Sequence, residues 1–259
     1  MIRFSNRAIN LNASPTLALD ALAKELQSQG KKTINLTAGE PDLATPAAIR
    51  LAAKQALDQG HTRYQPAAGI RPLREAIANK LRQQNQIAAK ADEVVVGVGA
   101  KQLLAAVFYI LCQEKDEVIV PIPTWGTFIT QVRLAGATPV LARLKAPFIA
   151  TAKEVEQKIT SRTRMVVVNS PANPTGAIIP AEEIKKLTDL AIKHNIWILS
   201  DETYEAFVYE PIRLVSPASV SELAKQQTIT VNTCSKTYAM TGWRVGYAHA
   251  PLVIADKLI

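Results

Sequence analysis

From residue 93 onward, short runs of valine and isoleucine alternate with longer stretches of helical periodicity. Apolar side chains occupy neighbouring positions in these runs, as in strands that helices cover on both faces. Strands joined by crossover helices form mainly parallel sheets. The pattern therefore predicts an α/β fold with a seven-stranded, mainly parallel sheet sandwiched by helices. The predicted strands are Glu93–Gly97, Glu117–Pro121, Thr138–Ala142, Met165–Asn169, Ile196–Ser200, Thr228–Asn232 and Val245–Ala250.

The helix expected between the fourth and fifth strands carries signals at both ends. Pro180 opens it, and Glu182 and Glu183 suit the positive end of the helix dipole. Lys193 and His194 suit its negative end. These signals make this crossover helix the clearest one in the chain.

The part of the chain before the sheet is predicted to be helical. Helices are expected at 17–29 and at 45–60. A third is expected from Pro72, because a proline suits the first turn of a helix. We expect residues 1–45 to form an N-terminal arm with part of a small domain. Residues 46–259 are expected to form a large domain.

The composition of this 259-residue chain argues against several classes of protein. No apolar run approaches the length of a membrane span, and the segment Met1–Arg7 lacks the apolar core of a signal peptide. Cys112 and Cys234 are too few for a disulfide framework, so we expect a cytoplasmic protein. The net charge of +8 comes from dispersed basic residues, which disfavours nucleic-acid binding. The three histidines are scattered, which disfavours a zinc site.

The segment Thr233–Tyr247 places Lys236 between small hydroxyl residues, with Arg244 eight positions later. A solvated loop lysine is one interpretation. However, the segment connects two predicted core strands, where functional residues of α/β proteins tend to collect. A lysine amine can condense with an aldehyde to give a Schiff base, while Thr233, Ser235 and Arg244 can bind a phosphate. The segment therefore predicts a site for an aldehyde cofactor that carries a phosphate.

Two further polar groups follow the ends of predicted strands. Asp201 follows Ile196–Ser200, and Asn173 follows Met165–Asn169 in an Asn-Pro-Thr-Gly turn. The carboxyl ends of core strands usually face a ligand crevice, and a carboxylate there can keep a pyridine nitrogen protonated. Tyr204 can donate to the phenolic oxygen of the same ring. The alternatives are a helix cap or salt bridge for Asp201 and a purely structural turn for Asn173.

A glycine-containing segment, Gly97–Lys101, follows the first strand and opens a helix predicted at Gln102–Leu111. Small residues at a helix N-terminus let backbone amides approach a phosphate. A dinucleotide fingerprint is the alternative, but it fits poorly because Gln102 stands where its third glycine belongs. Trp125, just after the second strand, is either a core residue or a flat ring that stacks on an aromatic cofactor.

Five motifs of the chain share one known pattern: Leu36–Asp42, Tyr64–Gly69, Asn169–Gly176, Ser200–Tyr204 and the Lys236 segment. Together they resemble the class I, fold-type I aminotransferases that depend on pyridoxal phosphate, close to the bacterial aspartate aminotransferases. The spacing between Lys236 and Arg244 also matches the family, and the resemblance runs over nearly the whole chain.

The resemblance implies roles for the residues around the cofactor. Lys236 resembles the lysine that forms the Schiff base and moves the proton at the substrate Cα. Asp201 resembles the partner of the pyridine nitrogen. Asn173 and Tyr204 resemble the donors to the phenolic oxygen of the cofactor, and Trp125 resembles the ring that stacks on the pyridine.

The resemblance also implies a phosphate site. Thr233 is a weaker candidate for a phosphate ligand than the residues that resemble the family's phosphate ligands. Those residues are Gly99, Ala100, Lys101, Ser235 and Arg244.

Other residues resemble groups that reach the substrate or a second subunit. Gly39 resembles the glycine that meets the substrate carboxylate, and Trp125 and Asn173 are expected to contact the substrate as well. Tyr64 resembles a tyrosine that reaches the phosphate of the neighbouring subunit, which implies a homodimer. Lys101 stands where some bacterial members meet a distal carboxylate, which favours aspartate or glutamate as the substrate.

Members of this family continue beyond the helix that starts near Ile254, into a small domain that supplies an arginine for the substrate carboxylate. We therefore expect a C-terminally truncated chain with exposed apolar patches. The implied function is the transfer of an amino group between an L-amino acid and a 2-oxo acid. The alternatives are a β-lyase on the same scaffold and a truncated chain that binds the cofactor without turnover.

Overall fold

The structure is a computed structural model that describes residues 4–5, 9, 15–37, 39–209 and 211–259. The chain divides into two compact units, Met1–Ala44 and Thr45–Ile259. The first unit contains the helix α2 (Pro15–Ser28). Ala38 of the predicted Leu36–Asp42 motif and most of Met1–Arg7 lie outside the described residues. The assignment of residues 1–45 to an arm and part of a small domain stays a prediction.

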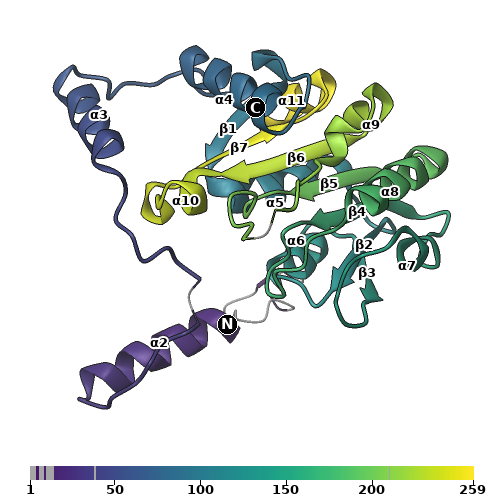
Figure 1. Cartoon of the computed structure of the whole chain (residues 1–259), viewed down its shortest axis with the longest axis horizontal. Coiled ribbons are helices and arrows are strands. Elements are labelled where there is room, and N and C mark those ends of the chain that lie inside the picture. The colour runs from purple at the N-terminus through teal and green to yellow at the C-terminus, as the bar shows by residue number, and fades with distance from the viewer. Residues whose placement is uncertain (1–3, 6–8, 10–14, 38, 210) are drawn as a thin grey trace. The chain divides into compact units, whose positions relative to one another are not determined.

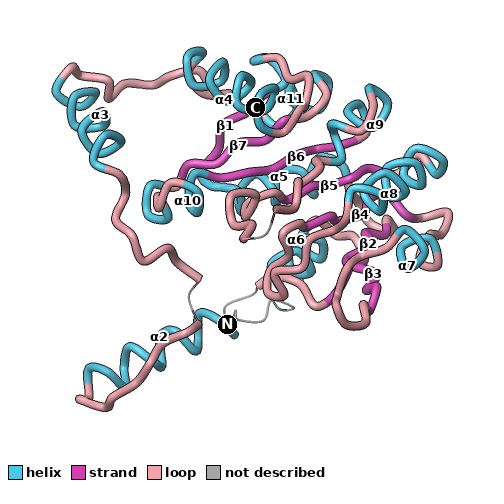
Figure 2. Tube along the Cα trace, in the orientation of Figure 1, coloured by secondary structure: helices cyan, strands magenta, loops and turns pink. Residues whose placement is uncertain are grey.

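The second unit is built on one seven-stranded sheet (Figures 1 and 2). The strands lie in the order β1-β7-β6-β5-β4-β2-β3. Strand β7 runs antiparallel to both of its neighbours, and the other neighbouring pairs are parallel. The prediction of a seven-stranded, mainly parallel sheet is therefore confirmed. The strands are β1 (Val94–Val98), β2 (Glu117–Ile122), β3 (Thr138–Arg143), β4 (Thr163–Asn169), β5 (Trp197–Asp201), β6 (Thr228–Thr233) and β7 (Val245–His249).

Helices connect these strands, and none of the described helices is both long enough and apolar enough to span a bilayer. Lys236, which was expected in a connection, lies on the short helix α10 between β6 and β7. The α-helices of this unit are α3 (Ala47–Asp58), α4 (Arg71–Gln84), α5 (Gly99–Leu111), α6 (Thr127–Leu134), α7 (Ala152–Glu156), α8 (Ala181–His194), α9 (Glu222–Gln226), α10 (Cys234–Thr237) and α11 (Leu252–Leu258).

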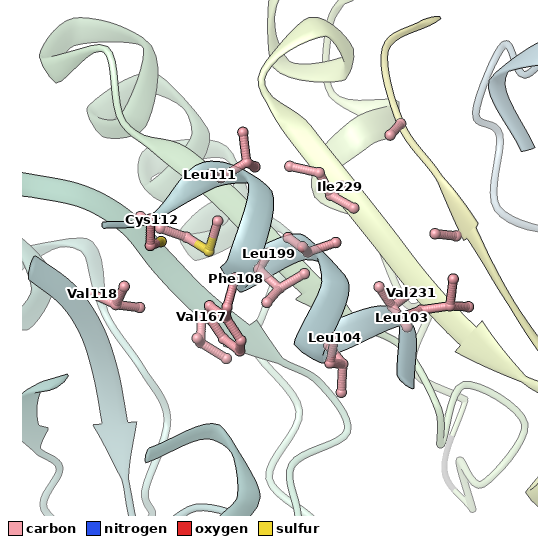
Figure 3. Packing of buried hydrophobic residues seen from close by; sticks show 14 of the residues in the cluster. Leu103, Leu104, Phe108, Leu111, Cys112, Val118, Val167, Leu199, Ile229 and Val231 are labelled. Carbon is pink, nitrogen blue, oxygen red and sulfur yellow. The ribbon is translucent and has the colours of Figure 1, made fainter. Parts of the chain in front are cut away.

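The two faces of the sheet are buried by different helices. On one face, Phe108 of α5 packs in a single buried cluster with Val167 and Leu199 of the central strands (Figure 3). On the other face, Ile198 packs in a second cluster with Leu187 of α8. Because side chains alternate along a strand, the residues of β5 are divided between an α5 face and an α8 face. This double cover explains why the strands are apolar at successive positions.

Four strand ends meet at one edge of the sheet. Because β1 and β6 both run antiparallel to β7, β1 points in the same direction as β4, β5 and β6. The register pairs Asn169 with Asp201 at the ends of β4 and β5, and Val98 with Val245 at the end of β1 and the start of β7. The segments that leave this edge carry most of the predicted site residues.

Candidate active site

Asp201 is the last residue of β5. It lies on the α5 face of the sheet, because side chains alternate along a strand and Leu199, two residues earlier, faces α5. Only 4% of Asp201 is exposed, and its Oδ1 accepts a hydrogen bond from the Thr203 N–H at 3.0 Å. Burial raises the pKa of the Asp201 carboxyl. The ionised form of such a carboxyl is stabilised by a cation that is buried with it.

Asn169 connects the ends of β4 and β5. Its side-chain Nδ2 donates to the backbone oxygen of Asp201 at 3.1 Å, and its Oδ1 accepts from the N–H of Asn173 at 2.9 Å. One amide side chain thus fixes the loop that carries Asn173 against the strand that carries Asp201. The sequence motif contains Asn169, but its role as a positioning residue was not predicted, because its partners become evident only when β4 and β5 are paired.

Tyr204 lies between Asn173 and Lys236. Its hydroxyl is 3.5 Å from Nδ2 of Asn173, and its ring centroid is 5.9 Å from Nζ of Lys236. Burial raises the pKa of Tyr204, and the negative charge of Asp201 adds to this effect. The phenol therefore remains a protonated hydrogen-bond donor at neutral pH. The structure brings together four predicted residues, from the ends of β4, β5 and β6.

The N-terminus of α5 reaches the same edge of the sheet. Gly99 opens α5 with a φ of +75°, and a Cβ at this position would collide with the guanidinium group of Arg244. On β7, a Cβ at Gly246 would lie 2.5 Å from the backbone nitrogen of Ala100. The two glycines therefore let Arg244 and β7 approach the start of α5. N–H groups at a helix start and a guanidinium beside them can bind an anion.

Arg244 is held by its own segment. It adopts a left-handed backbone conformation with a φ of +57°, which is uncommon for a residue with a side chain. Its Nη1 donates to the backbone oxygen of Thr241 at 2.7 Å. The remaining guanidinium donors can bind an anion at the start of α5.

The hydroxyl group of Thr233 is used to build α10. As the N-cap of α10, its Oγ1 accepts from the N–H of Ser235 at 3.1 Å, and it lies 2.9 Å from the backbone oxygen of Val245. The Ser235 Oγ lies 2.9 Å from the same Thr233 Oγ1. Thr233 thus shapes the segment, in keeping with its weaker rank as a phosphate ligand, and Ser235 stays a phosphate candidate.

Trp125 packs partly against the core, as one of its two interpretations expects. Its ring packs edge to face on Phe128, at a centroid distance of 5.6 Å, and is partly buried against the core. The ammonium group of Lys101 lies 5.1 Å from the centroid of the Trp125 ring. Lys101 is held through its backbone oxygen, which accepts from the Gln131 side chain at 2.8 Å. The stacking of Trp125 on a cofactor stays a prediction.

Tyr64 is a predicted site residue that lies apart from this cluster. Tyr64, between α3 and α4, has a fully exposed side chain, with a relative exposure of 105%. Gly39 belongs to the first unit, Met1–Ala44, so its predicted contact with a substrate stays a prediction.

Comparison with known proteins identifies the family of the chain. The family model for aminotransferase class I and II matches residues 31–259. The chain belongs to this family. It is 46% identical over 249 residues to a probable aspartate/prephenate aminotransferase of Aquifex aeolicus, an alignment that covers 95% of this chain and 63% of the relative. It is 44% identical to an aspartate aminotransferase of Bacillus sp. strain YM-2, over 94% of this chain and 63% of the relative.

A solved structure supports the fold in the same way. The aspartate aminotransferase of Thermus thermophilus with maleate superposes with a TM-score of 0.96 at 42% identity, over 100% of this chain and 67% of that one. The chain thus spans about 63% of the length of the curated relatives described above.

Proposed function

We propose that this chain binds pyridoxal phosphate and transfers an amino group between an L-amino acid and a 2-oxo acid. The observation that carries the proposal is the convergence of Lys236, Tyr204, Asn173 and Asp201 at one edge of the sheet, beside the N-terminus of α5. A reactive amine, a phenol donor, a buried carboxyl and an anion site are the groups that a phosphorylated pyridine aldehyde requires.

The chemistry of the donor set fits this cofactor. The buried carboxyl of Asp201 suits a protonated ring nitrogen, because the pair of opposite charges offsets the cost of burying either one. Asn173 and Tyr204 would donate to the phenolic oxygen. The start of α5 (Gly99, Ala100, Lys101), with Ser235 and Arg244, would hold the phosphate.

When bound, pyridoxal phosphate supplies an electrophilic aldehyde and a cationic ring that withdraws electrons from the substrate Cα. Lys236 would hold the cofactor covalently and, once released, accept the proton from the substrate Cα. Tyr204 and Asn173 would orient the ring by donating hydrogen bonds to its phenolic oxygen. Asp201 would keep the ring nitrogen protonated, and Trp125 would pack on the ring face.

A substrate with a second carboxylate is favoured. Lys101 carries an exposed ammonium group beside Trp125, at 5.1 Å from the ring centroid, and this group can meet a distal carboxylate. Relatives at 44–46% identity carry the names aspartate and aspartate/prephenate aminotransferase. The Thermus aspartate aminotransferase was solved with maleate, which is a dicarboxylate. We therefore propose aspartate and glutamate as amino donors.

The working form that we propose is a cytoplasmic homodimer. The fully exposed side chain of Tyr64 supports a role outside its own subunit, at the phosphate of the partner's site. Gly39 would meet the substrate carboxylate.

Covalent trapping tests the cofactor site. The chain is incubated with pyridoxal phosphate and reduced with borohydride, and the modified peptide is identified by mass spectrometry. We expect label on Lys236 and none in Lys236→Ala. Lys185→Ala, at an exposed lysine of α8, is the matched control and should retain the label. Equal labelling of many lysines, with no loss in Lys236→Ala, would contradict the proposal.

Product analysis separates the alternatives. An aminotransferase converts aspartate and 2-oxoglutarate to oxaloacetate and glutamate, and the reaction requires the oxo-acid acceptor. A β-lyase given an amino acid with a leaving group on its β-carbon, such as a cysteine thioether, releases the thiol, pyruvate and ammonia without an oxo-acid acceptor. Label on Lys236 without turnover would indicate a chain that binds the cofactor but does not act on substrates.

A further inference from the structure

Glu202 is a buried carboxyl group that the proposed reaction does not use. It follows Asp201 directly, and only 5% of it is exposed. Ser200 lies two residues after Ile198 and therefore on the same α8 face of the sheet. Its hydroxyl donates to Glu202 Oε1 at 2.9 Å. Asp201 and Glu202 are therefore adjacent in sequence, but they face opposite sides of the sheet.

Both carboxylate oxygens of Glu202 accept hydrogen bonds. On Oε1, the Ser216 hydroxyl donates at 2.6 Å in addition to Ser200. On Oε2, Nδ2 of Asn85 donates at 3.0 Å. These donors come from three separated segments of the chain, so Glu202 fixes them relative to one another.

Asn85 connects Glu202 to Glu205. The same Nδ2 donates to Glu205 Oε2 at 2.7 Å. The amide of Asn85 is oriented by Lys80, whose ammonium group donates to its Oδ1 at 2.8 Å and also forms an ion pair with Glu205. A flipped amide would present its oxygen to two carboxylates, so the observed orientation is strongly favoured.

The two carboxylates are the first and last residues of the turn that carries Tyr204. The N–H of Glu205 donates to the backbone oxygen of Glu202 at 3.0 Å, which closes a four-residue turn with Tyr204 in third place. The N–H of Phe207 then donates to the oxygen of Tyr204 at 2.8 Å. Asn85 therefore fastens both ends of the turn from the α8 side of the sheet.

We propose that Asn85 and Glu202 are positioning residues that hold the Glu202–Glu205 turn so that the Tyr204 hydroxyl stays at the site. The proposal rests on the proposed function where it concerns the hydrogen bond from Tyr204 to the cofactor. We call the hydrogen bonds from Asn85 to Glu202 and Glu205 the clamp. If the clamp is lost, the turn gains freedom, and the phenol of Tyr204 is displaced from Asn173 without any change to the residues of the site itself.

Amide hydrogen exchange of the cofactor-free 259-residue chain tests the clamp directly. We expect Asn85→Ala and Glu202→Ala to raise exchange of the amides of residues 203–207 by at least about tenfold, because buried hydrogen bonds that hold the turn are lost. A cavity of about 520 Å³ beside Glu202 can admit water, so the alanine variant need not collapse the fold. Unchanged exchange in both variants would overturn the proposal.

Two further variants separate the clamp from a general loss of stability. In Glu202→Gln, the amide oxygen still accepts a hydrogen bond from Asn85, and the amide nitrogen can donate to the hydroxyl groups of Ser200 and Ser216, which can rotate to accept it. We therefore expect wild-type exchange at residues 203–207. Glu117→Gln is the matched control, because Glu117 is also a buried carboxyl with hydroxyl and arginine partners, but it lies at the start of β2. It should lower stability without raising exchange at 203–207. Exchange in Glu202→Gln that equals that of Glu202→Ala contradicts the clamp.

A spectroscopic double-mutant cycle tests whether the clamp acts through Tyr204. With pyridoxal phosphate bound, Tyr204→Phe is expected to shift the pH midpoint of the cofactor absorbance, and Asn85→Ala should shift it in the same direction. In the Tyr204→Phe background, Asn85→Ala should add no further shift. Full additivity would show that Asn85 acts elsewhere and would overturn the proposal. If the wild-type chain binds no cofactor, the proposed function fails, and hydrogen exchange still decides the clamp.

Discussion

At the scale of single residues, the proposed role of Asp201 depends on its negative charge. The carboxyl is buried at the end of β5, where an opposite charge is screened weakly. Two unit charges 4 Å apart attract by about 4 kcal/mol at an effective dielectric constant of 20. A neutral group of the same shape therefore removes a large stabilisation of a protonated ring.

For Asp201→Asn we expect amino-group transfer to slow by roughly 100-fold or more, because about 3–4 kcal/mol of electrostatic stabilisation is lost. The control is Asp189→Asn, which removes an exposed carboxylate on α8 and should retain wild-type rates. The measurement is the single-turnover rate with aspartate at saturating cofactor. An unchanged rate in Asp201→Asn would remove the role assigned to this residue.

The pKa of Glu202 makes a second prediction at this scale. Burial, with the nearby charge of Glu205 adding to it, raises the pKa of Glu202 from 4.5 to about 7. The folded chain therefore holds this proton more tightly than the unfolded chain does. The stability contributed by this group is complete below about pH 4.5 and is lost as the pH rises through about 7.

The comparison with Glu202→Gln isolates this contribution, because the amide does not titrate. Between about pH 5 and pH 8 we expect the wild-type chain to lose roughly 2–3 kcal/mol of unfolding free energy relative to Glu202→Gln. Urea unfolding at both pH values gives the difference. Parallel stability curves for the two proteins would contradict the raised pKa.

At the scale of the elements, the N-terminus of α5 depends on a glycine. Gly99→Ala would strain a backbone with a φ of +75° and displace the guanidinium of Arg244. We expect the affinity for pyridoxal phosphate to fall by about tenfold or more, since a charged hydrogen bond to the phosphate is lost. The affinity for pyridoxal, which has no phosphate, should change much less.

The control for Gly99 is Gly126→Ala at the N-cap of α6. Gly126 has an ordinary φ of −56°, and a Cβ there would meet no atom within 4 Å. Fluorescence titrations with both ligands provide the dissociation constants. An equal loss of affinity for pyridoxal and for its phosphate in Gly99→Ala would argue against a phosphate site at α5.

The elements also show how far the sequence predicts the structure. The Val/Ile runs predict every strand to within about two residues, because strands buried on both faces have a strong apolar signal. Helix α10 was not predicted, since it has only four residues and depends on the Thr233 cap. Side-chain signals for so short a helix are too few to distinguish it from a loop.

The same contrast holds for the site. Lys236, Asp201 and Asn173 could be proposed because each follows a predicted strand end. Asn85 and Glu202 could not, because a loop carboxylate has no distinctive local sequence and its amide partner is 117 residues away. Contacts of this kind depend on how distant segments pack, which local periodicity does not encode.

At the scale of the whole molecule, α3 exposes apolar side chains that a partner surface can cover. None of the residues of α3 is buried, and Leu51 and Leu57 are 56% and 63% exposed. Exposed leucines on one helix favour contact with another apolar surface. A contact through these leucines is consistent with the proposed homodimer.

We expect the chain to self-associate at micromolar concentration and the double variant Leu51→Gln/Leu57→Gln to weaken this association. Fully burying a leucine contributes about 1.5–3 kcal/mol, so removing two partly exposed leucines should raise the dissociation constant by roughly 10- to 100-fold. Sedimentation velocity measures the effect, and Lys54→Gln, on the same helix, is the control. If the double variant associates like the wild type, the contact lies elsewhere, and the role of Tyr64 in a partner's site must be tested independently of α3.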